Sequence, residues 1–293
     1  MLPRDSGALC SSVVQKSMPE LPEVETIKRD LELKLLGQRI TQVTVYDSLV
    51  IRGLKEREFI KNLINKKIVC ISRRAKAIVC AFDEGSFLVV QLRMTGQLMY
   101  KEEYERIKET RVIFKLANGH FLNFNDQRRF GRLIYAKDLK EIAYLENAGP
   151  EPLNGTFSAQ WLQEALQKRK TSIKTLLLNQ QFLAGIGNIY ASEILFTARI
   201  HPAKEARALS SKEVLALCKA VRNVLSEAIK YRGTSMRNYR DLFGREGQFN
   251  QRLNVYGREG GPCKVCRKPI ECLVQTGRST FFCPGCQGHG LGL

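Results

Sequence analysis

The sequence predicts an α+β protein with a β-rich first part, a helical second part and a small cysteine module near its end. Short runs of β-branched and aromatic residues, separated by Asp, Asn and Gly, fill residues 38–136. Beyond a Gly- and Pro-rich segment at 149–155, the apolar positions follow a helical period. Five of the nine cysteines follow residue 262, and four of these form two Cys-x2-Cys pairs. These patterns predict two domains and a compact terminal module.

A helix over residues 22–36 should begin the folded chain and flank the β-rich domain. Glu23 lies in its first turn, where a carboxylate suits the helix dipole, and Gly37 supplies a stop signal. The β-rich runs predict an antiparallel sandwich or barrel, with Asn118-Gly119 as a hairpin turn. The apolar positions of the helix recur with a helical period at Val24, Ile27, Leu31 and Leu35.

The helical domain should follow a boundary at the Gly- and Pro-rich segment. Residues 233–261 are rich in Gly, Arg and Asn, which predicts a mobile loop after the last helix. Helices are predicted over 158–168, 172–178, 187–197 and 210–230. The expected organisation is an extension at 1–18, a first domain at 19–148, a hinge at 149–157, a helical domain at 158–261 and a cysteine module at 262–287.

The chain is strongly basic. It has 47 Lys and Arg against 29 Asp and Glu, a formal net charge of +18 and a pI near 9.6. This excess favours a polyanion such as nucleic acid, although a functionally neutral basic surface would have the same composition. No apolar run approaches the ~20 residues of a spanning helix. Because residues 1–17 hold only a short, weakly apolar stretch, we expect neither membrane association nor organelle targeting.

The strongest local signal is the paired spacing Cys263-x2-Cys266 and Cys283-x2-Cys286. Paired knuckles of this kind bind zinc through four thiolates, and four unrelated thiols are the alternative. Four thiolates leave no open coordination position. We therefore predict one structural zinc ion in a zinc-ribbon hairpin, and no organic cofactor.

Several polar residues lie in settings suited to DNA. Arg278 is at the predicted turn between the knuckles, and a guanidinium binds phosphate as a bidentate fork. Arg128 and Phe130 pair a cation with an apolar ring that could fill the gap left by a flipped base. Asn188 follows a glycine turn whose amides could bind phosphate. Taken alone, each has a simpler structural explanation as a surface Arg, a core Phe or a tight turn.

Lys76 lies in the segment Arg73-Arg74-Ala75-Lys76 between two apolar runs. Neighbouring guanidinium groups should make its ammonium form less favourable, which suits proton transfer. The alternative is a side chain that simply points outward from a strand.

Taken together, the motifs of residues 18 to about 287 resemble those of formamidopyrimidine-DNA glycosylases. Met18 begins the segment MPELPEVET, and RRAK, MTG, RRFG, GIGNIYASE, VYGREG and the cysteine module follow in that family's order. The resemblance implies a β-sandwich, a helix-two-turn-helix domain and a zinc finger. It also implies excision of 8-oxoguanine and formamidopyrimidines from double-stranded DNA, followed by strand cleavage through β,δ-elimination.

The resemblance also implies roles for individual residues. Pro19 would be the N-terminal amine that attacks the sugar through a Schiff base, and Glu20 would donate a proton. Lys76 would hold phosphate and assist elimination, and Arg278 would serve the later elimination. A loop at 233–250 would cover the flipped base. The DNA-binding residues would be Met94, Arg111, Arg128, Phe130, Arg169, Asn188, Thr234 and Ser235.

Three positions depart from the family pattern. Glu109 replaces a phosphate-binding His, and Arg111 could substitute for it. Gln127 stands where Pro is frequent. Residues 1–17 would bury the Pro19 nitrogen in a peptide bond, which translation from Met18 and removal of that Met would resolve. Processing of the extension and a catalytically silent protein are the alternatives.

Two hypotheses of different class follow. The first is a bifunctional glycosylase and lyase of base excision repair. The second is a non-catalytic, zinc-dependent protein that binds DNA damage if the extension is retained. We expect a monomer in the bacterial cytoplasm, associated with the nucleoid.

Overall fold

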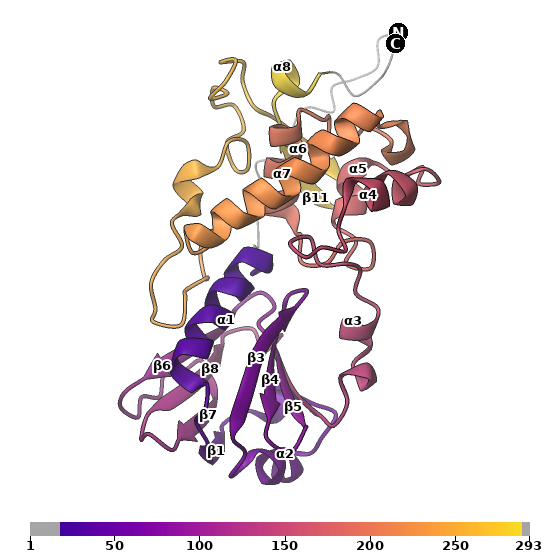
Figure 1. The fold of residues 1–293 in the computed structure, drawn as a ribbon. Coiled ribbons are helices and arrows are strands. Elements are labelled where there is room, and N and C mark those ends of the chain that lie inside the picture. Colours follow the sequence, from indigo (N-terminus) through magenta and orange to yellow (C-terminus); the bar gives the residue numbers. More distant parts are fainter. Residues whose placement is uncertain (1–17, 289–293) are drawn as a thin grey trace.

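The computed structural model describes residues 18–288 and confirms the α+β fold, with a β-sandwich domain, a helical domain and a terminal zinc-ribbon hairpin (Figure 1). The first domain holds two separate sheets, so it is a sandwich rather than a barrel. One sheet is antiparallel in the order β1-β7-β8-β6, formed by Ile40–Val45, Thr110–Leu116, Phe121–Asp126 and Gly96–Lys101. The other has the order β2-β9-β5-β4-β3, formed by Ile51–Arg52, Arg132–Ala136, Phe87–Gln91, Ala77–Phe82 and Ile68–Arg74.

Helix α1 (Leu21–Leu35) runs from the helical domain to the sandwich (Figure 1). The predicted apolar stripe is buried in the sandwich core, where Val24, Ile27 and Leu31 are inaccessible to solvent. Leu21, one turn earlier, belongs to the core of the helical domain. The backbone N–H of Glu20 donates to the Glu23 carboxylate at 2.8 Å, which fixes the start of the helix. The N-terminal half of α1 therefore packs in the hydrophobic cores of both domains.

The hairpin between β3 and β4 places Lys76 at its turn. Arg74 pairs with Ala77, so Ala75 and Lys76 form a two-residue connection. Ala75 has φ of +52°, a left-handed conformation that costs a non-glycine residue about 1 kcal/mol or more. Contacts from elsewhere in the molecule must hold this turn.

The two domains are joined by a connector, residues 137–158, that contains α3 (Ala143–Glu146) (Figure 1). The helices of the second domain lie within two residues of the predicted ranges at both ends. They are α4 (Ala159–Leu166), α5 (Ile173–Leu177), α6 (Asn188–Ala198) and α7 (Ser211–Lys230). Ser158, Ser172 and Ser210 cap three of them by accepting backbone N–H groups, as short hydroxyl side chains do at N-caps. The first domain has one further helix, α2 (Glu56–Leu63).

Residues 233–261 do not form the loose loop that their composition predicts. The segment contains a 3-10 turn at Phe249–Arg252, and Asp241 and Leu242 are fully buried. Arg232 pairs with Asp30 of α1 and with Asp241. Buried charge pairs and apolar packing therefore hold this segment against the first domain, an arrangement that Gly and Asn content cannot reveal.

The terminal module consists of β10 (Glu271–Gln275), β11 (Arg278–Phe282) and α8 (Pro284–Gln287). Phe281 packs its ring edge against Tyr256 at 5.2 Å between centroids, and both belong to the core of the helical domain. Within residues 18–288, the helices are too short or too polar to cross a lipid bilayer.

Candidate functional site

A small pocket lies at the junction of the domains. Pro19 is buried there, immediately before α1, and Lys76 enters from the β3–β4 turn. Gln91 ends β5 and is only 3% exposed, yet its Oε1 has no hydrogen-bond partner among the described residues. The pocket is lined by Met18, Pro19, Lys76, Gln91, Arg93 and Tyr144. The structure thus brings together the residues predicted as nucleophile and amine, and adds four that the sequence analysis did not select as site residues.

Glu20 is held at the N-terminus of α6. Its carboxylate accepts the backbone N–H groups of Gly187 at 2.7 Å, Ile189 at 2.9 Å and Tyr190 at 3.4 Å. Burial raises the pKa of Glu20 above its ordinary value, and the nearby Lys76 charge and the three amides oppose that rise. The amides predicted to bind phosphate are therefore occupied by Glu20, which corrects the interpretation of the glycine turn.

Gly187 leaves no space for a larger side chain beside Glu20. A Cβ added there would lie 2.7 Å from Cγ of Glu20 and closer still to its carboxyl group. We expect Gly187→Ala to displace Glu20, which the family resemblance predicts to be the proton donor, and so to lower single-turnover base excision by about 100-fold, the scale of one lost acid. Gly155→Ala is the matched control, because a Cβ there meets nothing within 4 Å. Excision assays of both variants test this, and equal rates would contradict the placement of Glu20.

Lys76 has a pKa lowered from its ordinary value, as predicted, but for a different main reason. Burial is the largest cause, Glu20 opposes it, and Arg278 adds to it. The neighbouring Arg73 and Arg74 instead form ion pairs with Glu151. Arg278 itself is exposed at the start of β11.

A buried polar network links the pocket to the residues predicted as a capping loop. The Glu23 carboxylate accepts the hydroxyl of Tyr190 at 2.5 Å and the backbone N–H of Thr234 at 2.7 Å. Burial, together with the neighbouring Glu20 charge, raises the pKa of Glu23 to about 7. Ser235 is also buried, and its hydroxyl donates to the carbonyl of Tyr239 at 2.8 Å. Thr234 and Ser235 therefore have structural partners before any DNA is bound.

The residues predicted to fill the space of a flipped base form one cluster. An Arg128 Nη1 N–H donates to Met94 Sδ at 3.2 Å, and the guanidinium lies 4.5 Å from the centre of the Phe130 ring. Phe130 is 49% exposed, unusual for a large apolar ring and suited to contact with bases. Asp126 is fully buried and accepts the N–H of Gly131 at 2.6 Å, which fixes the intervening turn. Met94, Arg128 and Phe130 thus lie side by side.

Asn188 is connected to the terminal hairpin through Lys174. Lys174 Nζ donates to Asn188 Oδ1 at 2.7 Å and to Thr280 Oγ1 at 2.6 Å, and Asn188 Nδ2 donates to the Ser279 carbonyl at 2.9 Å. Burial lowers the pKa of Lys174 to about 7. Lys174 is therefore a buried link between the helical domain and the hairpin, with no exposure to solvent. In the sequence, the only sign that Lys174 is buried is its place within an apolar helical pattern.

The remaining predicted phosphate ligands differ in their surroundings. Arg169 is exposed in the segment that follows α4. Arg111 is half-buried, and its Nε donates to the Asp126 carbonyl at 2.8 Å. Its guanidinium is thus partly engaged within the protein, as is the backbone of Glu109, whose carbonyl accepts the Asp126 N–H at 2.8 Å.

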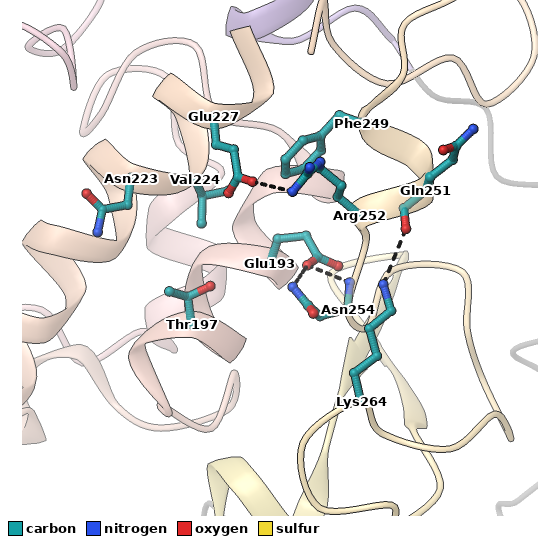
Figure 2. A pocket seen from close by; sticks show the side chains of 10 residues that line it. All are labelled: Glu193, Thr197, Asn223, Val224, Glu227, Phe249, Gln251, Arg252, Asn254 and Lys264. Atoms are coloured by element: carbon teal, nitrogen blue, oxygen red, sulfur yellow. Dashed lines mark hydrogen bonds and ion pairs between the residues drawn. The ribbon is translucent and has the colours of Figure 1, made fainter. Parts of the chain in front are cut away.

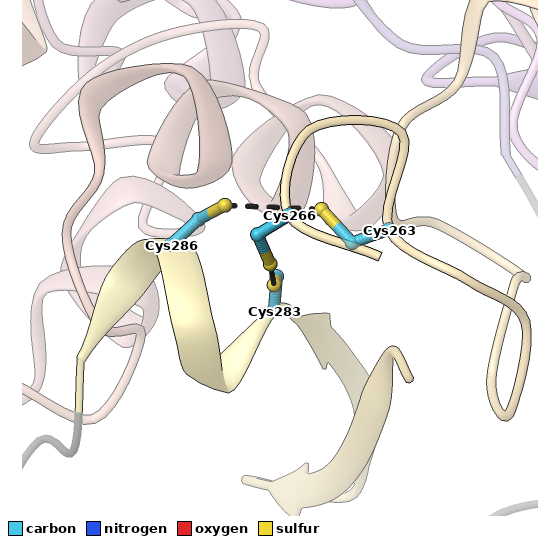
Figure 3. A group of neighbouring side chains, drawn as sticks. All are labelled: Cys263, Cys266, Cys283 and Cys286. Atoms are coloured by element: carbon cyan, nitrogen blue, oxygen red, sulfur yellow. Dashed lines mark hydrogen bonds between the residues drawn. The ribbon is translucent and has the colours of Figure 1, made fainter. Parts of the chain in front are cut away.

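The four predicted zinc ligands converge (Figure 3). Sγ of Cys263 and Cys286 lie 3.8 Å apart, and those of Cys266 and Cys283 lie 3.3 Å apart. All four sulfur atoms are within 4.8 Å of one another. Zn–S bonds of about 2.3 Å in a tetrahedron require separations of roughly 3.8 Å, so the donor set fits one structural zinc ion.

A second pocket lies between α6, α7 and the segment before the zinc module (Figure 2). Glu193 at its floor accepts the backbone N–H groups of Asn254, Val255 and Tyr256, each at 2.9 Å. These bonds fix the segment leading to the cysteines. None of the predicted site residues lines this pocket.

Three family models match the chain in the order of its structural modules. They are the formamidopyrimidine-DNA glycosylase N-terminal domain at residues 18–133, its H2TH domain at 148–240, and a zinc finger found in FPG and IleRS at 260–288. The fold and site thus define the chain as a helix-two-turn-helix protein with a zinc finger.

Similar proteins agree with these modules. The formamidopyrimidine-DNA glycosylase of Desulforamulus reducens is 44% identical over 274 residues, 92% of this chain and 99% of the relative. The chain therefore belongs to the formamidopyrimidine-DNA glycosylase family. The MutM (FPG) protein of Thermus thermophilus is 40% identical with a TM-score of 0.83, covering 93% of this chain and 100% of that structure. Lactococcus lactis Fpg bound to abasic-site DNA is 34% identical with a TM-score of 0.85, covering 92% and 100%.

Proposed function

We propose that this chain is a DNA glycosylase of base excision repair that excises oxidised purines and then cleaves the strand by β,δ-elimination. The observation that carries the proposal is the pocket itself, in which Pro19 and Lys76 meet beside a buried Glu20. The family relationship supports damaged DNA as the substrate, since a related Lactococcus lactis protein was solved with DNA containing a formamidopyrimidine.

The chemistry follows from the opposite pKa shifts of two neighbouring groups. The raised pKa of Glu20 favours a protonated carboxyl that can donate, and the lowered pKa of Lys76 favours an amine that can accept. The Pro19 nitrogen bonds to C1′ of the damaged nucleotide, and the base leaves with the electron pair of the glycosidic bond and takes a proton from water. The Pro19 ammonium then passes its proton to the neutral Lys76 amine, and the ring oxygen leaves C1′ with a proton from Glu20. The product is an open-chain iminium, from which proton loss at C2′ expels the 3′ phosphate and a further elimination expels the 5′ phosphate.

The DNA contacts in this proposal come from both domains. Met94, Arg128 and Phe130 occupy the space of the flipped base, and Arg128 contacts the opposite base. Arg111, Arg169, Asn188 and Arg278 hold phosphates, and Thr234 and Ser235 belong to the loop over the base. The 149–157 segment acts as the hinge, with the catalytic domain before it and the DNA-binding and zinc modules after it. One chain supplies every group, so we propose a monomer. We also propose that it is associated with the nucleoid in the bacterial cytoplasm, because the similar proteins come from bacteria.

Excision of a defined lesion tests the proposal. A chain beginning at Pro19 should release 8-oxoguanine from a duplex with cytosine opposite and leave a cleaved strand, whereas undamaged duplex should stay intact. Glu20→Gln keeps the size of the side chain but not its proton, and we expect it to lower the single-turnover excision rate by about 10²–10⁴-fold. Chromatography of the released base and gels of the strand measure both steps. Wild-type activity in Glu20→Gln would exclude the carboxyl as the acid.

A second function is favoured by one observation, that Pro19 follows Met18 in the chain and so lacks a free amine. A protein that keeps its extension would bind damaged DNA through the exposed ring and the zinc hairpin without excising a base. The mass of the cellular protein distinguishes the two functions.

A further inference from the structure

The turn that carries Lys76 is held by two side chains from the connector between the domains. The backbone N–H of Lys76 donates to the Tyr144 hydroxyl at 3.2 Å. The N–H of the preceding Ala75 donates to Glu151 Oε1 at 2.6 Å. Both donors belong to a two-residue hairpin turn, whose N–H groups often face solvent. Here they face the connector instead.

These contacts oppose the strain of the turn. The left-handed φ of Ala75 is unfavourable for a residue with a Cβ, so the turn needs stabilising contacts. A buried carboxylate is a strong acceptor for an amide, and Glu151 is only 7% exposed. Glu151 is itself fixed by Arg73 Nη1 at 2.7 Å. The orientation of the turn therefore depends on the connector.

Tyr144 has a second contact that points to the same pocket. The Arg93 guanidinium lies 5.7 Å from the centre of the Tyr144 ring, and both residues line the pocket of Pro19. Arg93 has φ of +56°, so its backbone is also in a conformation that needs support. One aromatic side chain thus touches the lysine turn with its hydroxyl and the arginine with its ring.

We propose that Tyr144 and Glu151 are positioning residues for Lys76, and that Tyr144 also orients Arg93 toward the phosphate of the damaged nucleotide. The inference rests on the proposed function, because Lys76 is given its chemical role there. It adds that the connector sets the position of the Lys76 amine relative to Pro19. A movement of the connector on DNA binding would then shift the Lys76 amine, because Tyr144 and Glu151 are hydrogen-bonded to the turn that carries it.

Tyr144→Phe is the direct test, because it removes the hydroxyl and keeps the ring. In zinc-loaded protein beginning at Pro19, we expect single-turnover cleavage of abasic-site duplex to fall about fivefold, as for one lost hydrogen bond. Affinity for duplex with a tetrahydrofuran abasic analogue should change less than about twofold, since the DNA contacts remain. The midpoint of the pH–rate profile should move to higher pH, because a loosened turn leaves Lys76 less buried.

Tyr135→Phe is the matched control, since Tyr135 of β9 is half-buried and lines a different pocket. It should leave the rate, affinity and pH midpoint unchanged. Cleavage by Tyr144→Phe within twofold of wild type at every pH would overturn the inference, as would a parallel loss of affinity and thermal stability. Lys76→Ala separates the proposed function from the positioning role of Tyr144. If Lys76→Ala cleaves like wild type, the chemical role of Lys76 is wrong. If Lys76→Ala is inactive while Tyr144→Phe cleaves normally, only the positioning role is wrong.

Discussion

Protein that begins at Pro19 should be trapped by borohydride as a covalent complex with damaged duplex, and protein that retains residues 1–18 should not. The nitrogen of an internal proline is a tertiary amide without N–H, and its lone pair is delocalised into the carbonyl. A terminal proline is a secondary amine that yields a cationic iminium directly. We expect a difference of at least about 10³-fold in trapped complex, the scale of losing a covalent nucleophile.

The control for this experiment is a protein with a single alanine added before Pro19. It preserves the pocket residues Lys76 and Gln91 but converts the nucleophile to an amide. It should bind abasic-analogue duplex like the active protein and give no covalent complex. Intact-mass measurement establishes which N-terminus each sample carries. A strong adduct from the extended protein would transfer the role to another amine, with Lys76 the nearest candidate in the pocket.

Removal of the metal should abolish specific DNA binding while leaving the sandwich folded. The hairpin between the cysteine pairs carries Arg278 and contacts Asn188 and Lys174 through Ser279 and Thr280. Without a cation, four thiolates within 4.8 Å of one another would repel. We expect Cys266→Ser or chelation to weaken the affinity for abasic-analogue duplex by at least about 100-fold, because several phosphate contacts are lost together.

Fluorescence anisotropy measures this affinity, and circular dichroism reports the retained strands. Zinc should restore binding to the chelated protein, whereas magnesium should not, because thiolates prefer the softer ion. Cys70→Ser is the matched control, since Cys70 is exposed on β3, outside the module. Full affinity in metal-free protein would show that the hairpin does not need the ion.

Periodicity and spacing were sufficient to predict much of the fold. The stripe of Val24, Ile27 and Leu31 identified α1 because burial on one face imposes that period. Cys263 and Cys266 identified the metal module because ligand spacing follows from tetrahedral geometry. Both signals are local, so neighbouring residues in the sequence carry them.

The contacts that organise the pocket are not local. Glu20 caps a helix that begins 168 residues later, at Asn188, so no nearby pattern reveals that its amides are taken. Gln91 ends an apolar run and reads as part of a strand, while its Oε1 lies buried beside Pro19. Lys174 follows other basic residues in sequence, yet tertiary packing buries it. Burial of polar groups is decided by which elements meet, information that a single segment lacks.

The position of α1 limits how this protein can be divided or recombined. Leu21 packs in one hydrophobic core and Val24 in the other, so the first turn of the helix is shared between the two domains. An isolated sandwich would expose Leu21 and lose the α6 amides that hold Glu20. A chimaera that takes its two halves from different relatives must therefore match residues 19–24 to the second half, although they are encoded with the first.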